Sequence, residues 1–229
     1  MAKANLSHYV KKITAKYLLA KEKYMSIVDQ IRRENERYKS IDQDKYSLQG
    51  RKELIVEHDA IIRPLRAEMD AIRAQFEYDA REIIKESDKI FNRRYCYTPA
   101  DIDNNGITIL EKGNLSDAEV MQMADNYLQA GNSTMYFLCA DKLNASEDAN
   151  CRTYYSQAIK MRNYREDHKI LNGVIGICSA GLRTETTMSR ELDDGIGASE
   201  MVNNNMENYL SEYIKQADAI AVEYANPWE

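Results

Sequence analysis

Apolar residues recur at alternating steps of four and three through the first part of the chain. The series runs through Leu6, Val10, Ile13, Tyr17, Ala20, Tyr24, Ile27 and Ile31, and Tyr38, Ile41 and Leu48 continue its register. Such spacing is typical of a helix that buries a narrow stripe against another helix. It predicts a first helix over about residues 5–48, in which the polar residues Glu34 and Lys45 interrupt the seam.

A second series begins after Gly50, in which an apolar residue returns at every seventh position. Its members are Ile55, Ile62, Met69, Phe76, Ile83 and Ile90. Two helices of about equal length joined at a glycine predict an antiparallel hairpin over residues 6–94, with its bend near Gly50. The phase does not change at Pro64, so we expect the second helix to continue through this proline with a kink.

The character of the sequence changes after Arg94. Two short β-prone runs, 95–98 and 107–110, flank a turn-rich loop and predict a small β-hairpin. Ser116, with Glu119 three residues later, matches a capping box, and the helix that it starts should end at Gly131. Further helices are expected from Asn132 or Ser133 to Leu143, from Ser146 or Asp148 to 172–173, and over about 198–225, the last with Val202, Met206, Tyr209, Tyr213, Ile220 and Tyr224 on one face.

These patterns predict a mainly α fold. A long antiparallel, coiled-coil-like helical hairpin, residues 1–95, should be followed by a smaller, mostly helical domain, residues 96–229, with at most one short β-hairpin. The low content of glycine and proline, 9 and 3 residues of 229, agrees with a helical protein.

Tyrosine is unusually frequent, with 16 residues against 3 phenylalanines and one tryptophan. Its ring can be buried while its hydroxyl stays in water, which suits interfaces. Trp228 follows a predicted helix end close to the last residue, where we expect it to be a contact residue and not part of the core. The candidate interaction residues are therefore Tyr17, Tyr24, Arg32, Arg33, Tyr38, Tyr209, Tyr213 and Trp228.

The formal net charge of −6 is unevenly distributed along the chain. Residues 1–95 carry 21 Lys and Arg against 16 Asp and Glu, whereas residues 96–229 carry 10 against 21. This split favours head-to-tail contacts in which the first half of one molecule meets the second half of another. The basic residues of the hairpin alternate with acids, which argues against a nucleic-acid partner.

The sharpest local motif comprises Asp101, Asp103, Asn105 and Gly106, which match the opening positions of an EF-hand calcium loop. Lys112 stands where the closing bidentate carboxylate is needed, so a turn capped by its own short side chains is the preferred interpretation. The three histidines lack a second ligand at helical spacing, and His58 should be hydrogen-bonded across the hairpin. The adjacent acids Glu166–Asp167 and Asp193–Asp194 suit a solvated face.

The remaining signals predict a protein without catalytic residues or a cofactor. Gly173, Gly176 and Gly181 fit neither a phosphate loop nor a dinucleotide motif, and close helix packing is the expected use of these glycines. The four cysteines are not arranged as a disulfide framework, so we expect reduced thiols. Neither a signal peptide nor a membrane span is evident, which predicts a soluble protein made in the cytoplasm.

The charged helical hairpin, the tyrosine- and asparagine-rich second half, and the helix pair marked by 115–119 and 132–135 resemble the head and tail morphogenesis proteins of tailed phages and prophages of Gram-positive bacteria. The resemblance implies a non-enzymatic virion, decoration or scaffold-type protein, and we expect it to bind itself or other virion proteins. The absence of a long apolar segment predicts no membrane partner. A cytoplasmic coiled-coil adaptor or regulatory protein is the second hypothesis. An enzyme whose site assembles from scattered residues is the third.

Overall fold

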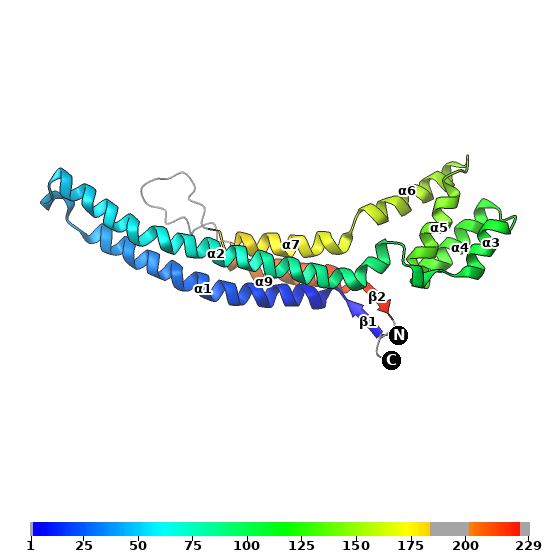
Figure 1. The fold of residues 1–229 in the computed structure, drawn as a ribbon, viewed down its shortest axis with the longest axis horizontal. Helices are drawn as coiled ribbons and strands as arrows, with labels where there is room; N and C mark the ends of the chain where they lie inside the picture. Colours follow the sequence, from blue (N-terminus) through cyan, green and yellow to red (C-terminus); the bar gives the residue numbers. More distant parts are fainter. Residues whose placement is uncertain (1, 184–201, 225–229) are drawn as a thin grey trace. The chain divides into compact units, whose positions relative to one another are not determined.

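The computed structural model describes residues 2–183 and 202–224, so Trp228 and the Asp193–Asp194 pair lie outside the described residues (Figure 1). The fold is mainly α-helical with a long N-terminal hairpin, as the sequence predicts. Two compact units are drawn from separated segments: the first from 1–8, 84–170 and 217–229, the second from 9–83 and 171–216. This division differs from the expected one at residue 95, because helices from the second half of the chain complete the unit that contains most of the hairpin.

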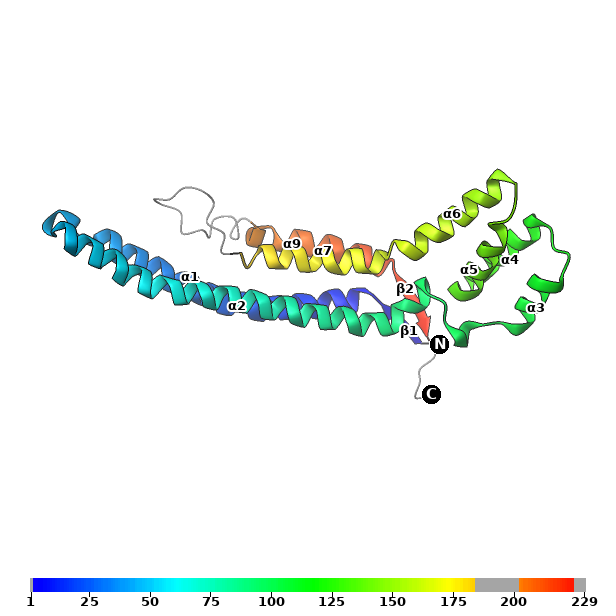
Figure 2. The ribbon, with the colours of Figure 1, turned by 45° about the horizontal axis from the view of Figure 1, so that its top comes forward.

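Helix α1, Ser7–Ser40, and helix α2, Leu48–Tyr95, form the hairpin and lie side by side (Figures 1 and 2). A short 3₁₀ turn, η1, Gln43–Lys45, connects them, and a carboxylate oxygen of Asp42 accepts a hydrogen bond from the Asp44 N–H at 3.2 Å. The first helix therefore ends about eight residues earlier than predicted, and Gly50 lies in the first turn of α2. Helix α2 continues through Pro64, as predicted.

Four helices form the core of the second unit. They are α1, α2, α9, Met206–Asp218, and the part of α7, Glu166–Ala180, that begins at residue 171. The Tyr17 and Phe76 rings pack edge to face with centroids 6.1 Å apart. The buried hydrophobic residues are Tyr9, Val10, Ile13, Tyr17, Tyr24, Ile27, Val28, Ile31, Ile62, Met69, Phe76, Ala80, Ile83, Leu171, Val174, Cys178, Leu182, Met206 and Leu210. The heptad seam predicted from the sequence therefore forms the core along this part of the hairpin.

Two of the three glycines expected to allow close helix packing do so. A Cβ atom at Gly173 would lie 2.6 Å from Tyr213 Oη, and one at Gly181 would lie 2.8 Å from Tyr17 Oη. Gly176 has no atom within 4 Å of its Cβ position. The predicted end of a helix at Gly173 is wrong, because this glycine lies inside α7. The sequence predicted a single helix up to this glycine, but the structure has two helices there: α6, Ala149–Asn163, and α7.

The first unit contains a small helical core built by α3, Asn104–Lys112, α4, Asp117–Gln129, α5, Ser133–Leu143, and α6. The predicted capping box is present, since Ser116 and Glu119 each accept from the other's backbone N–H. Gly131 adopts a φ of 75°, and Asn132 caps α5. The buried residues of this core are Leu110, Val120, Ala124, Tyr136, Phe137, Cys139, Ala140, Leu143, Cys151 and Ala158.

The predicted β-hairpin over 95–110 is wrong. Residues Pro99–Asp101 form a 3₁₀ turn, η2, and 107–110 belong to α3, because Asp103 caps that helix by accepting from the Asn105 N–H at 3.0 Å. The described strands are instead β1, Ala2–Asn5, and β2, Ala221–Tyr224, which pair antiparallel with Ala2 opposite Tyr224. The last helix consequently ends at Asp218 and not at 225. Among the described helices, none has an apolar stretch of the length needed to cross a bilayer.

Candidate interaction surface

The distal part of the hairpin, residues 32–61, is here called the arm. The buried positions of the seam stop at Ile31 on α1 and at Ile62 on α2, and none of the thirty arm residues, all of them described, is buried. In Figures 1 and 2 the arm continues beyond the ends of α7 and α9, which accompany only the proximal part of the hairpin. The arm is therefore a pair of helices without a core of its own.

Polar contacts between α1 and α2 hold the arm together. Arg37 Nη2 lies 2.8 Å from Glu34 Oε1, and it also reaches Glu57 Oε1 on α2 at 3.4 Å. The hydrogen bonds that Arg37 donates to Glu34 hold the pKa of the Glu34 carboxyl below the usual range. The charge of Glu34, which interrupts the seam, is thus balanced by Arg37 of the same helix. Arg37 also contacts Glu57 of the other helix.

A histidine bridges the two helices one turn away. His58 Nε2 lies 3.0 Å from Asn35 Oδ1, and the His58 ring packs on Tyr38 with centroids 4.5 Å apart. This arrangement confirms the prediction that His58 is hydrogen-bonded across the hairpin. The contacts are polar or half-buried, so they fix the register of the arm without removing much apolar surface from water.

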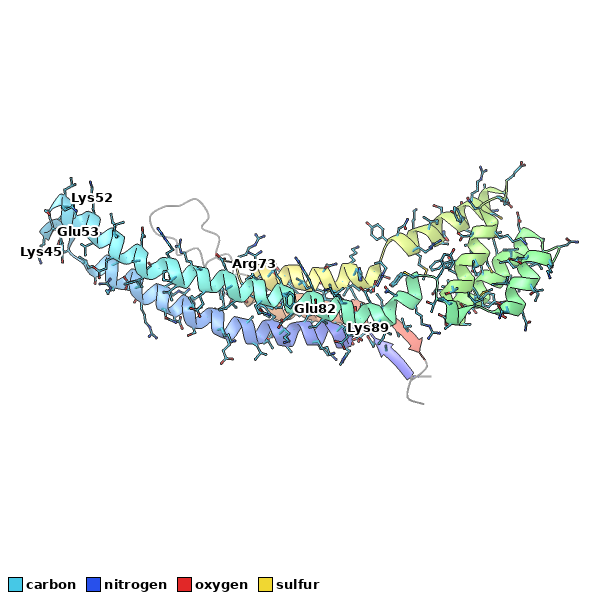
Figure 3. The ribbon with its side chains drawn as sticks, viewed as in Figure 1. Lys45, Lys52, Glu53, Arg73, Glu82 and Lys89 are labelled. Carbon is cyan, nitrogen blue, oxygen red and sulfur yellow. The ribbon has the colours of Figure 1, made fainter. Side chains whose placement is uncertain are left out.

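The end of the arm is closed by short-range ion pairs. Lys45 Nζ lies 3.2 Å from Asp42 Oδ2, and Arg51 Nη2 lies 3.1 Å from Asp44 Oδ1. Figure 3 shows Lys45 and Lys52 at this free end. Exposed pairs of this kind contribute about 0–1 kcal/mol each, so they shape the turn more than they stabilise it.

Helix α2 presents apolar side chains to solvent along the arm. Leu48 is 76% exposed, Ile55 49% and Val56 67%. Together with the exposed residues Lys52 and Asp59 they follow one another at i, i+4, i+7, i+8 and i+11, which places them on one face of the helix. This set of five residues is called the arm stripe.

The predicted interaction residues are distributed between core and surface. Tyr17 and Tyr24 are fully buried, so these two predictions are wrong as surface contacts: the Tyr17 hydroxyl donates to Asn203, and that of Tyr24 donates to the Arg183 carbonyl at 2.6 Å. Burial raises the pKa of Tyr17 well above its ordinary value. The heptad pattern could not show whether a seam residue is buried inside its own chain or is available to a partner.

The other predicted contact residues are more accessible. Arg33 is exposed, whereas Arg32 and Tyr38 are half-buried, and all three belong to the arm. Tyr209 is 44% exposed on α9, and Tyr213 packs over Gly173. The structure therefore brings Arg32, Arg33 and Tyr38 together with the arm stripe on one helical pair, and it places Tyr209 and Tyr213 elsewhere in the second unit.

The candidate calcium residues are engaged by the protein itself. Both carboxylate oxygens of Asp101 accept from Arg93, with Nε to Oδ2 at 2.8 Å. Asp103 accepts from the Tyr127 hydroxyl at 2.6 Å, and this bond lowers the pKa of Asp103. Asn105 lies in the first turn of α3. The segment thus forms the capped turn preferred from the sequence, followed by a helix where an EF-hand would continue as a loop.

Sequence reasoning missed a charge cluster in the first unit. Asp88, Asp167 and His168 place ligand atoms within 4.8 Å of one another, and Asp167 is fully buried, so the prediction that it lies on a solvated face is wrong. Arg165 Nη2 lies 2.7 Å from carboxylate oxygens of both aspartates, and His168 Nε2 lies 2.6 Å from Asp88 Oδ1. The guanidinium supplies the positive charge between the two carboxylates, which makes this cluster an ion-paired joint between α2 and α7.

Comparisons with protein-family models, with curated proteins and with solved structures find no match.

Proposed function

We propose that this protein is a non-enzymatic structural or assembly protein whose arm docks on other protein subunits. The observation that carries the proposal is the arm itself: thirty residues in a regular hairpin, none of them buried, with three large apolar side chains exposed on one face. The Leu48, Ile55 and Val56 side chains give a partner apolar surface to cover.

The energetics of an uncovered helical pair support this role. Isolated helices of about 12–15 residues are marginal in water, and side-chain pairs along a helix add only about 0.2–0.5 kcal/mol each. Covering apolar surface contributes about 25 cal/mol per Å². A protein partner over the arm stripe would therefore stabilise the arm more than its own ion pairs do.

The resemblance to phage morphogenesis proteins extends the proposal to a virion component. Capsid, decoration and scaffold proteins work through contacts between protein subunits, and the projecting arm suits such contacts. Gene order tests this extension: a coding sequence among head and tail genes supports it, and a locus among metabolic genes contradicts it.

The docking role is tested with a photo-crosslinking residue placed at Ile55, in the cells that make the protein. Tyr78, 62% exposed on the proximal part of the same helix, is the matched control position. We expect adducts from position 55 to a protein identified as a particle subunit or a second copy of this chain, and fewer adducts from position 78. Equal yields at both positions would contradict docking through the arm, and adducts with one host regulatory protein would favour the adaptor hypothesis.

A further inference from the structure

We propose that the arm pairs with the arm of a second copy of this chain, with the two α2 helices antiparallel about a two-fold axis between Ile55 and Val56. The inference rests on the proposed function, because it names the partner of the same surface. Two features of the arm stripe, its spacing and its charge order, point to this occupant.

The spacing of the stripe continues the seam that forms the core of the second unit. Leu48, Lys52, Ile55 and Asp59 follow steps of four, three and four, in register with the buried residues Ile62 and Met69. Steps of this kind form a continuous seam for a second helix. In the part of the chain that the structure describes, the seam positions from Ile55 to Leu48 are exposed, which leaves them accessible to a second helix.

The order of charges selects an antiparallel copy. Lys52 lies three residues before Ile55, and Asp59 lies three residues after Val56. An axis between these two apolar residues therefore places Lys52 of each chain opposite Asp59 of the other, which makes two equivalent ion pairs around an apolar centre. A parallel pairing in register would place Lys52 against Lys52 and Asp59 against Asp59, which is unfavourable.

The total charge of the arm permits this contact. Residues 32–61 contain seven Lys and Arg and seven Asp and Glu, so two arms approach without net repulsion although the whole chain carries −6. A two-fold contact uses the same patch on both copies and closes at the dimer, whereas head-to-tail contacts continue into rings or arrays. The mass of the assembly therefore distinguishes the proposed arm-to-arm dimer from the larger head-to-tail assemblies that the charge split favours.

The experiment is sedimentation equilibrium of the full chain from micromolar to millimolar concentration. Wild-type protein should form a dimer, and Lys52→Asp or Asp59→Lys should each raise the dissociation constant by roughly tenfold or more, because both ion pairs become repulsive. An equimolar mixture of the two variants should dimerise again, since every contact then joins opposite charges. Lys23→Asp, at an exposed position on α1 outside the arm, should leave the dimer unchanged.

Three results would overturn the pairing: a monomer at every concentration, a dimer that Lys52→Asp does not weaken, or a mixture no tighter than its components. Unchanged melting temperatures of the variants exclude unfolding as the cause of a weaker dimer. A monomeric chain that still crosslinks through position 55 to a different particle protein would overturn the self-pairing and leave the proposed function standing. Equal crosslinking at positions 55 and 78 would instead count against the proposed function itself.

Discussion

Gly173 of α7 lies directly beneath the ring of Tyr213 of α9, so that a Cβ atom at residue 173 would meet Tyr213 Oη at 2.6 Å and Cε1 at 2.8 Å. Contacts under 3.0 Å require one of the two groups to move. This glycine sets how closely the two helices approach, although glycine inside a helix is intrinsically unfavourable.

Gly173→Ala should lower the free energy of unfolding by about 1–3 kcal/mol, because the added methyl group overpacks the contact with Tyr213. Gly176→Ala is the matched control in the same helix, where nothing lies within 4 Å of the Cβ position. That variant should raise the free energy of unfolding by about 0.5–1 kcal/mol through helix propensity. Urea unfolding measures both, and equal effects of the two substitutions would contradict the packing argument.

Arg165→Met should destabilise the protein by about 3–5 kcal/mol, because it leaves the fully buried Asp167 carboxylate without its cationic partner. The guanidinium also packs on the Tyr95 ring, 4.9 Å from its centroid, so the loss includes a cation–π contact. Urea unfolding of Arg152→Met is the control, since Arg152 is exposed and donates from Nη2 to the Glu147 carbonyl at 3.2 Å. A loss for Arg165→Met no larger than that of the control would show that the joint is not important for folding.

The four free thiols should differ sharply in reactivity. Cys96 is exposed, whereas Cys139, Cys151 and Cys178 are buried. Burial also raises the pKa of Cys139 to about 11 and that of Cys178 to about 12, which keeps these groups as unreactive thiols. A thiol-specific reagent should therefore modify one group per native chain and four in denaturant, and Cys96→Ser should abolish the native reaction. Rapid modification of more than one thiol would show that the cores open readily.

Because burial raises the pKa of Cys139, the free energy of unfolding should fall as the pH rises in the alkaline range. The folded chain keeps the proton up to about pH 11, while the unfolded chain releases it near its ordinary pKa of 9.0, so the folded state binds more protons between these values. Stability from this group is fully present below pH 9 and is lost as pH rises through 11. The difference between wild type and Cys139→Ala in unfolding free energy should narrow by about 2–3 kcal/mol across that window. A Cys96→Ala series serves as the control, and a constant difference for Cys139→Ala would contradict the linkage.

Local sequence signals predicted much of the secondary structure correctly. The heptad series predicted the hairpin, Ser116 with Glu119 predicted the start of α4, and Gly131 marked its end. These signals succeed because each depends on residues within two helical turns of one another. The same local signals failed at 107–110, where β-branched residues suggested a strand but the Asp103 cap begins a helix.

Only the tertiary structure decided which parts of these patterns face protein and which face solvent. Ile62 and Ile55 occupy equivalent seam positions in the sequence, yet the Ile62 side chain is 6% exposed and the Ile55 side chain 49%. A periodic apolar stripe predicts that a helix packs against a neighbour, but it does not predict how far along the helix that neighbour extends. The pairing of β1 with β2 and the contact of Arg165 with Asp88 of α2 likewise depend on partners far apart in the chain. The sequence alone determined a helical hairpin with an apolar seam, and the tertiary structure decided that this seam is buried at Ile62 and exposed at Ile55 and Leu48.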